Sequence, residues 1–100
     1  MLDLQVKSSG ITYGIMVWWN ECADATLYQI KLYLSNRGQT QLLATIPIER
    51  NTFYHTFTGL ATYEYVIEVS AENREGEVIA QGKTSRKVED LIQVYGYTGG

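Results

Sequence analysis

The chain has 100 residues, of which 8 are Lys or Arg and 11 are Asp or Glu, and its net charge is -3. A chain of this length buries roughly two-thirds of its unfolded surface, so we expect one domain with a core of its own. The single cysteine excludes an internal disulfide, and no Cys/His cluster has the spacing of a zinc site. The acidic balance argues against a nucleic-acid groove, and the apolar runs are too short to span a bilayer.

Strand-forming residues dominate the sequence. Aromatic residues make up 12% of it, β-branched residues are frequent, and no stretch keeps the apolar spacing of a helix. Turn-forming residues divide the chain at 8–10, 20–25, 35–38, 49–51, 59–62 and 73–76. Between these turns apolar and polar residues alternate with a period of two, which predicts an all-β antiparallel sandwich.

Three segments show this alternation most clearly. In chain order they are Ile15, Val17 and Trp19, then Tyr28, Ile30 and Leu32, then Tyr65, Ile67, Val69 and Ala71. Residues two apart in a strand point to one face, so each row is expected to face the core. The predicted anchors of the core are Trp19, Tyr28, Ile30, Leu60, Tyr65, Ile67 and Val69. The residues that alternate with those of the last row are mostly polar, as is typical of an antiparallel sheet with one face in water.

These segments, from about Leu4 to Val88, resemble a fibronectin type III domain, a sandwich of seven antiparallel strands. The motif Ile15-x-Val17-x-Trp19 resembles the B strand with its core tryptophan, and Tyr28-x-Ile30-x-Leu32 resembles the C strand. The block from Phe57-Thr58-Gly59-Leu60 through Tyr65 to Asn73-x-x-Gly76 resembles the E–F corner, the F strand and the F–G turn. The resemblance implies a tyrosine corner, in which the Tyr65 hydroxyl bonds to the preceding loop. It also implies a domain over residues 1–89, with 90–100 as an apolar C-terminal extension or a longer strand G.

Prolines are fewer than the resemblance leads one to expect. The family usually carries them after the core tryptophan, in the E–F corner and at the start of strand G, whereas this chain has only Pro47. Proline removes a donor from a sheet ladder and so blocks the addition of another strand. We therefore expect the sheet edges to be more available for pairing with another chain.

Catalytic groups are sparse. The one histidine, His55, lies among aromatic residues in a predicted strand, which favours a packed or rim position over a role as a base. Cys22 has acidic neighbours, which do not activate a thiol, and the acidic turn around Asn73 matches no calcium loop. We expect a protein that is not an enzyme and has no cofactor or metal.

Two adjacent tryptophans suggest a binding surface. In a strand only one of them points inward, and Trp19 fits the core position, which sends Trp18 and Met16 outward. Packing of Trp18 under the N-terminal strand or a loop is one interpretation. The other is that Trp18 is an anchor for a protein partner.

The C-terminal segment is too apolar for a linker in water. Its residues Leu91, Ile92, Val94, Tyr95 and Tyr97 would cost free energy if they were solvated. We therefore expect it either to extend strand G or to lie on another subunit, where these five residues would join Trp18 as partner-binding residues.

Together these features predict a non-catalytic structural or protein-interaction module. Domains like the one it resembles occur as extracellular spacers and as decorations of bacteriophage virions. The absence of a visible signal peptide, the lack of disulfides and the apolar tail favour a virion decoration or accessory protein of a phage capsid or tail, made in the cytoplasm. The alternatives are a fibronectin type III spacer or binding module of a secreted or cell-surface protein, and an intracellular adaptor or engineered binder. Expected partners are protein subunits, with no nucleic acid, membrane or small-molecule substrate.

Overall fold

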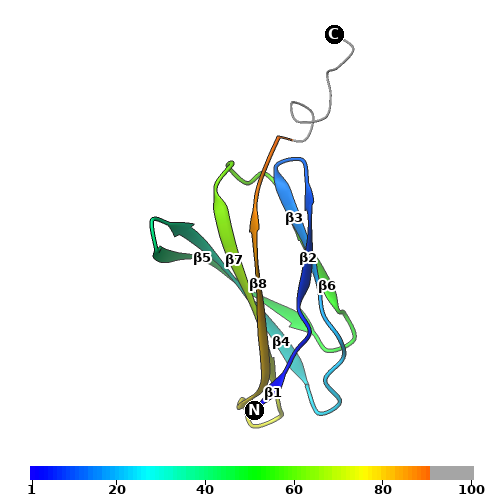
Figure 1. Ribbon diagram of the computed structural model, residues 1–100. Helices are drawn as coiled ribbons and strands as arrows, with labels where there is room; N and C mark the ends of the chain where they lie inside the picture. The colour runs from blue at the N-terminus through cyan, green and yellow to red at the C-terminus, as the bar shows by residue number, and fades with distance from the viewer. Residues whose placement is uncertain (91–100) are drawn as a thin grey trace.

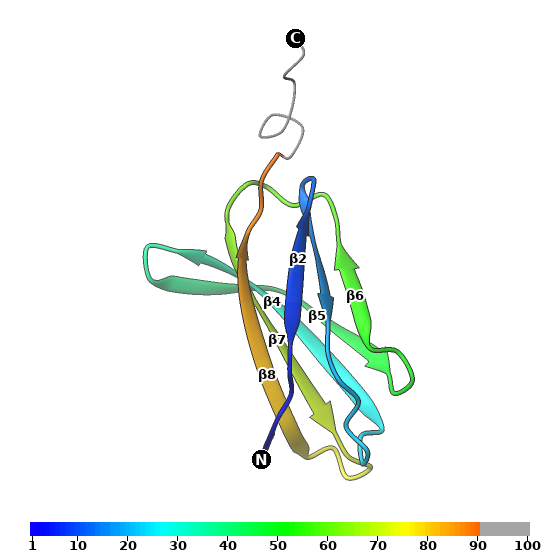
Figure 2. The same ribbon diagram turned by 45° about the vertical axis from the view of Figure 1, so that its right-hand side comes forward.

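The computed structural model describes residues 1–90, which form eight strands. Their bounds are β1 Leu2–Asp3, β2 Lys7–Ile11, β3 Gly14–Trp18, β4 Leu27–Asn36, β5 Gln39–Glu49, β6 Tyr54–Phe57, β7 Glu64–Glu72 and β8 Val78–Lys87. A five-stranded sheet in the order β1-β8-β7-β4-β5, the large sheet, faces a three-stranded sheet in the order β2-β3-β6, the small sheet (Figures 1 and 2). The predicted all-β sandwich is confirmed. Over these residues the structure has no helix of the length and apolarity needed to cross a membrane.

The core lies between the two sheets and contains the three alternating rows that the sequence predicts. All ten of their side chains are buried, with Ile15, Tyr28 and Ile67 fully so. The register of β4 on β7 sets Ile30 opposite Val69 and Leu32 opposite Ile67, so these two neighbouring strands present one apolar surface. Leu60, also expected as an anchor, is only partly buried and packs against the margin of this core.

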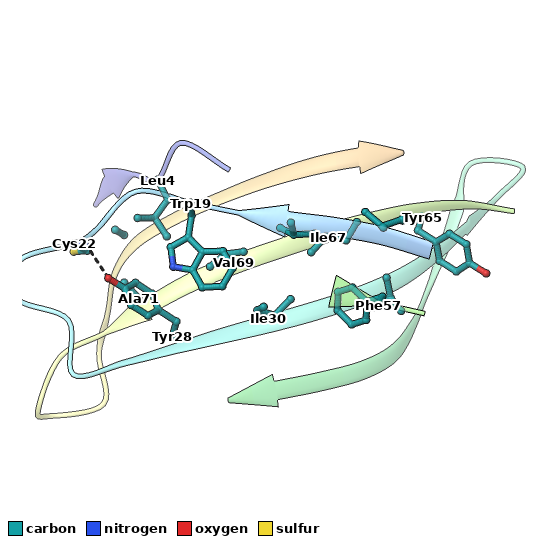
Figure 3. Packing of buried hydrophobic residues seen from close by; sticks show 14 of the residues in the cluster. Leu4, Trp19, Cys22, Tyr28, Ile30, Phe57, Tyr65, Ile67, Val69 and Ala71 are labelled. Carbon is teal, nitrogen blue, oxygen red and sulfur yellow. Dashed lines mark hydrogen bonds between the residues drawn. The ribbon is translucent and has the colours of Figure 1, made fainter. Parts of the chain in front are cut away.

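Aromatic rings pack against one another in the core, and Figure 3 shows Trp19 beside Tyr28. The Trp19 ring lies 5.6 Å from that of Tyr28, which in turn meets Phe53 at 6.1 Å in an edge contact. The Tyr28 hydroxyl accepts a 2.9 Å hydrogen bond from the backbone N–H of Cys22, so the loop after β3 is tied to the core. Burial raises the pKa of this phenol, because the ionised form is poorly solvated there.

The structure corrects the predicted start of the chain. Residues 8–10 were expected to form a turn, but they lie inside β2, and the turn follows at Tyr13. Ser8 is tolerated at an inward position because its hydroxyl hydrogen-bonds to Thr84 of β8 at 3.0 Å. The short strand β1, which adds to the seven expected strands, pairs in parallel with β8.

The chain crosses from the large sheet to the small sheet directly over Gly82. After β1, the Leu4 N–H donates to the Gln81 carbonyl at 3.0 Å, and β2 begins at Lys7. A Cβ on Gly82 would overlap the Leu4 carbonyl oxygen and come within 2.8 Å of Val6 Cγ2. Only glycine therefore fits beneath this crossing.

Polar contacts then close this side of the sandwich. The Arg86 guanidinium donates to the Ser8 carbonyl at 2.9 Å and to the Ser8 hydroxyl at 3.0 Å. These bonds join β8 of the large sheet to β2 of the small sheet, and they satisfy a backbone carbonyl on the free edge of β2.

The tyrosine corner generates the first testable prediction. The Tyr65 hydroxyl donates to the Ala61 carbonyl at 2.9 Å, which confirms the expected corner between β6 and β7. Tyr65→Phe keeps the ring and removes this bond, so the free energy of unfolding should fall by about 1 to 2 kcal/mol with an unaltered m-value. The matched control is Tyr63→Phe, since Tyr63 is exposed and its hydroxyl makes no hydrogen bond within residues 1–90. Equal denaturation midpoints for the two variants would contradict the role of the corner.

Gly82 generates the second prediction. Gly82→Ala should lower the free energy of unfolding by about 1 to 3 kcal/mol, because the new methyl group forces the crossing away from β8. Gly10→Ala in β2 serves as the control, since a Cβ there meets only Arg86 Cδ at 3.8 Å. Urea denaturation of both variants tests the idea, and an unchanged midpoint for Gly82→Ala would refute it.

Candidate partner-binding surface

Three large side chains gather on the outer face of the small sheet. Met16 and Trp18 of β3 are 39% and 38% exposed, and Tyr54 of β6 is 62% exposed. Trp18 lies directly opposite Tyr54 in the antiparallel pair, and Met16 lies one step along the same face, opposite Thr56. We call Met16, Trp18 and Tyr54 the outer patch. The prediction that Met16 and Trp18 point outward is confirmed.

The burial of their neighbours explains why these residues point outward. Ile15 and Val17 are fully buried, and Trp19 just beyond β3 is 4% exposed. Because successive side chains of a strand point to opposite faces, burying Ile15 and Val17 forces Met16 and Trp18 to the surface. The other neighbour of β3, β2, sets Lys7 opposite Trp18 and Ser9 opposite Met16. The outer patch is thus apolar and aromatic, with polar residues on its β2 side.

Tyr13 forms a junction at the end of the sandwich where β3 begins. Its N–H donates to the Glu89 carbonyl at 3.2 Å, its carbonyl accepts from the Leu60 N–H at 2.9 Å, and its hydroxyl donates to Asp90 Oδ2 at 2.7 Å. The bond to Asp90 raises the pKa of the Tyr13 phenol, with smaller contributions from desolvation and from the charge of Asp90. Tyr13 joins the β2–β3 turn, the β6–β7 loop and the end of the described chain.

The backbone of Tyr13 is left-handed, with φ of 53°. A non-glycine residue holds such a conformation only when its surroundings determine it, and the three hydrogen bonds do so. After β8 ends at Lys87, the Val88 N–H donates to the Tyr63 carbonyl at 2.9 Å. Asp90 then meets the Tyr13 hydroxyl. The described chain ends beside the β2–β3 turn (Figure 2).

The other predicted partner-binding residues are Leu91, Ile92, Val94, Tyr95 and Tyr97, and they lie outside the described residues. Strand β8, which pairs with β7, ends at Lys87. The division of the chain at residues 89 and 90 remains a prediction, as does the choice between a longer strand G and a docking tail.

A second candidate surface is the edge of the large sheet formed by β5. The hairpin of β4 and β5 projects from the sandwich (Figure 1), and Leu42 and Leu43 near its tip are exposed. Two features protect this edge. The register on β4 shifts at Leu43, which marks a bulge, and the one proline of the chain, Pro47, lies in the same strand. The edge is therefore less available for strand addition than the low number of prolines suggests.

The residues considered for catalysis lie apart in different settings. His55 of β6 is half-buried, with its ring 4.7 Å from that of Phe57 in an edge contact, which confirms a rim position. Cys22 is buried in the loop after β3. Within residues 1–90, no hydrogen bond links either side chain to a group that would activate it. Neither Cys22 nor His55 therefore forms part of a nucleophile–base pair in the described part of the chain.

The acidic turn at Asn73 is organised by hydrogen bonds from its backbone to the Asn73 side chain. The Asn73 side-chain oxygen accepts from the N–H of Glu75 at 3.0 Å and of Glu77 at 2.9 Å, and Gly76 follows with φ of 79°. The asparagine oxygen is thus used to form the turn. No group of three His, Cys, Asp or Glu side chains in the described part of the chain is placed to hold a metal ion.

The outer patch and the Tyr13 junction were only partly accessible to sequence reasoning. Trp18 and Met16 follow from alternation along one strand. Tyr54 was not identified as a surface residue from the sequence. Tyr54 and Thr56 are two residues apart in one strand, and this spacing alone places them on the same face. No sequence pattern marks Tyr13 as a junction, because its partners Leu60, Glu89 and Asp90 are far away in the sequence.

Comparison with known proteins confirms the fold. No family model matches the sequence, and no curated protein matches it as a relative. Among solved structures it is similar to the FN5 domain of Drosophila Lar, with a TM-score of 0.68 and 23% sequence identity over 87% of this chain and 95% of that domain. The chain thus has the fibronectin type III fold that the resemblance implied.

His55 generates a prediction of pH dependence. Desolvation lowers the pKa of its imidazole in the folded protein, so the unfolded chain binds a proton more readily. The stability that His55 contributes is therefore present above the unfolded pKa of about 6.5 and is lost as the pH falls through the folded pKa. The variant His55→Phe removes the only histidine and with it this pH dependence of stability. The carboxylates contribute their own pH dependence equally to both proteins. Denaturation midpoints at pH 7.5 and 5 should differ more for the natural chain than for His55→Phe, and equal differences would contradict the prediction.

Proposed function

We propose that this protein is a non-catalytic interaction module that binds another protein through the outer patch. The observation that carries the proposal is the side-by-side exposure of Trp18 and Tyr54 on a rigid sheet, with Met16 beside them. Aromatic residues are enriched in protein interfaces, where they bury a large area at a low cost in side-chain entropy. The fibronectin type III fold supports the proposal only by analogy, because one fold serves many functions.

The geometry of the outer patch suits an interface anchor. Trp18 stands on β3, whose other face is fully buried, so its backbone is held by the core. β3 is also the central strand of the small sheet and is paired on both sides. An anchor on such a strand is pre-organised, which reduces the entropy lost on binding. Lys7 and Thr56 supply a polar margin next to Trp18 and Met16.

We further propose that the partner belongs to a bacteriophage virion, with this chain as a decoration or accessory protein of the capsid or tail. The support is that the core closes around one free, buried cysteine, so its packing does not depend on an oxidising compartment. The apolar residues between 91 and 97 provide further surface for contact with a neighbouring subunit.

The experiment purifies the phage particles released by the organism that carries the gene for this chain. Mass spectrometry of purified particles should detect the natural chain in them. Its absence from the particles would overturn the virion proposal and leave the interaction module to be tested against secreted or surface proteins encoded by neighbouring genes.

The outer patch is tested in the same particles by Trp18→Ser. This variant should keep the melting temperature of the natural chain within a few degrees and lose most of its incorporation, because an exposed anchor contributes little to folding. Tyr33→Ser is the matched control, since Tyr33 is an aromatic residue on the outer face of the large sheet. Equal incorporation of the two variants would contradict the role of the outer patch.

A further inference from the structure

We propose that two copies of this protein pair through the free edge of β6, so that their small sheets join into one six-stranded sheet. The inference goes beyond the proposed function, since this contact requires no other protein. It combines the backbone groups that β6 leaves unpaired, the lack of protection along its edge and the register in which two such edges fit.

The backbone of β6 directs four polar groups away from its own sheet. Within the small sheet β6 pairs with β3 alone, and the Trp19 N–H donates to the Phe53 carbonyl at 3.0 Å. Hydrogen-bonded and non-bonded positions alternate along an antiparallel pair, so Tyr54 and Thr56 turn their N–H and C=O groups away from β3. Within residues 1–90 none of these groups has a hydrogen-bond partner.

The edge of β6 also lacks the features that protect the other edges. On β2, the opposite edge of the small sheet, Arg86 occupies the Ser8 carbonyl. Residues 52–57 contain no proline, lysine, arginine or acidic residue, and the register of β6 on β3 has no bulge. Figure 2 shows β6 at the margin of the small sheet. This edge is therefore available for pairing with another strand.

A second copy supplies the groups that this edge needs. With two β6 strands antiparallel about a two-fold axis beside His55, Tyr54 of each copy lies opposite Thr56 of the other. Each of these pairs exchanges two hydrogen bonds, which uses all four free groups of each copy. A slip of two residues leaves only one such pair within β6. The edge is thus complementary to itself, as an isologous dimer requires.

The pairing also joins the outer patches of the two copies. The row of Trp18 and Tyr54 continues into Thr56 and Met16 of the second copy, on the same face of the joined sheet. A paired edge of this length buries less than the roughly 800 Å² per partner of a standard interface, so we expect a weak dimer with a Kd on the order of 100 μM. The dimer presents twice the apolar surface of one chain.

Disulfide trapping tests the register. His55 lies opposite His55 of the second copy at a non-hydrogen-bonded position, where Cα atoms are about 4.5 Å apart and within the span of a disulfide. In a Cys22→Ala background, which removes the only natural cysteine, His55→Cys should form a linked dimer on mild oxidation. The matched control is Tyr54→Cys, which is more exposed. Its Cα atoms are offset by two residues and about 8 to 9 Å apart, so it should react at least about ten-fold more slowly.

Sedimentation velocity tests the pairing without a cross-link. Thr56→Pro removes an N–H that faces the second copy and keeps the bonds of β6 to β3, a position at which proline is tolerated. The sedimentation coefficient of the natural chain should rise with concentration, and that of Thr56→Pro should stay at the monomer value with a similar melting temperature. Thr56→Val, which keeps the N–H, should behave like the natural chain.

Two results would overturn the proposal. One is equal rates of linked-dimer formation for His55→Cys and Tyr54→Cys, which would show random collision in place of a fixed register. The other is a natural chain that sediments as a monomer up to about ten times the expected Kd, which would leave the β6 edge to a strand of a different protein. Neither measurement includes a virion or other partner, so its outcome is independent of the test of incorporation.

Discussion

The pleat of β3 determines both the core and the surface of this protein. Burying Ile15 and Val17 on one face places Met16 and Trp18 on the other, and a slip of one residue would exchange the two sets. The large sheet is constrained in the same way, because Ile30 of β4 faces the core opposite Val69 of β7. A side chain available for binding is thus a direct consequence of the alternation that forms the core.

The margins of the sandwich differ in how they are closed. On the side of β8, the crossing over Gly82 and the bonds from Arg86 to Ser8 join the two sheets. On the side of β5, the edge is protected by the bulge at Leu43 and by Pro47. Since the β8 and β5 edges of the large sheet are closed or blunted, an outer sheet face is a better candidate for recognition than strand addition at these edges.

The Tyr13 junction links the fold to the proposed function. It is the point where the segment after β8 meets the start of β3, and it holds Asp90 beside the sheet that carries the outer patch. The residue accepts a left-handed backbone to do so.

The sequence by itself determined the features that depend on local periodicity. The three buried rows, the outward position of Trp18 and the Tyr65 corner follow from spacing along single segments or from a motif. The tertiary structure alone decided which distant residues meet. The pairing of Trp18 with Tyr54 depends on the register of strands far apart in sequence, and the glycine at 82 depends on a chain crossing above it. Ser8 likewise lies in a strand because Thr84 and Arg86 satisfy its polar groups, and turn propensity carries no information about such partners.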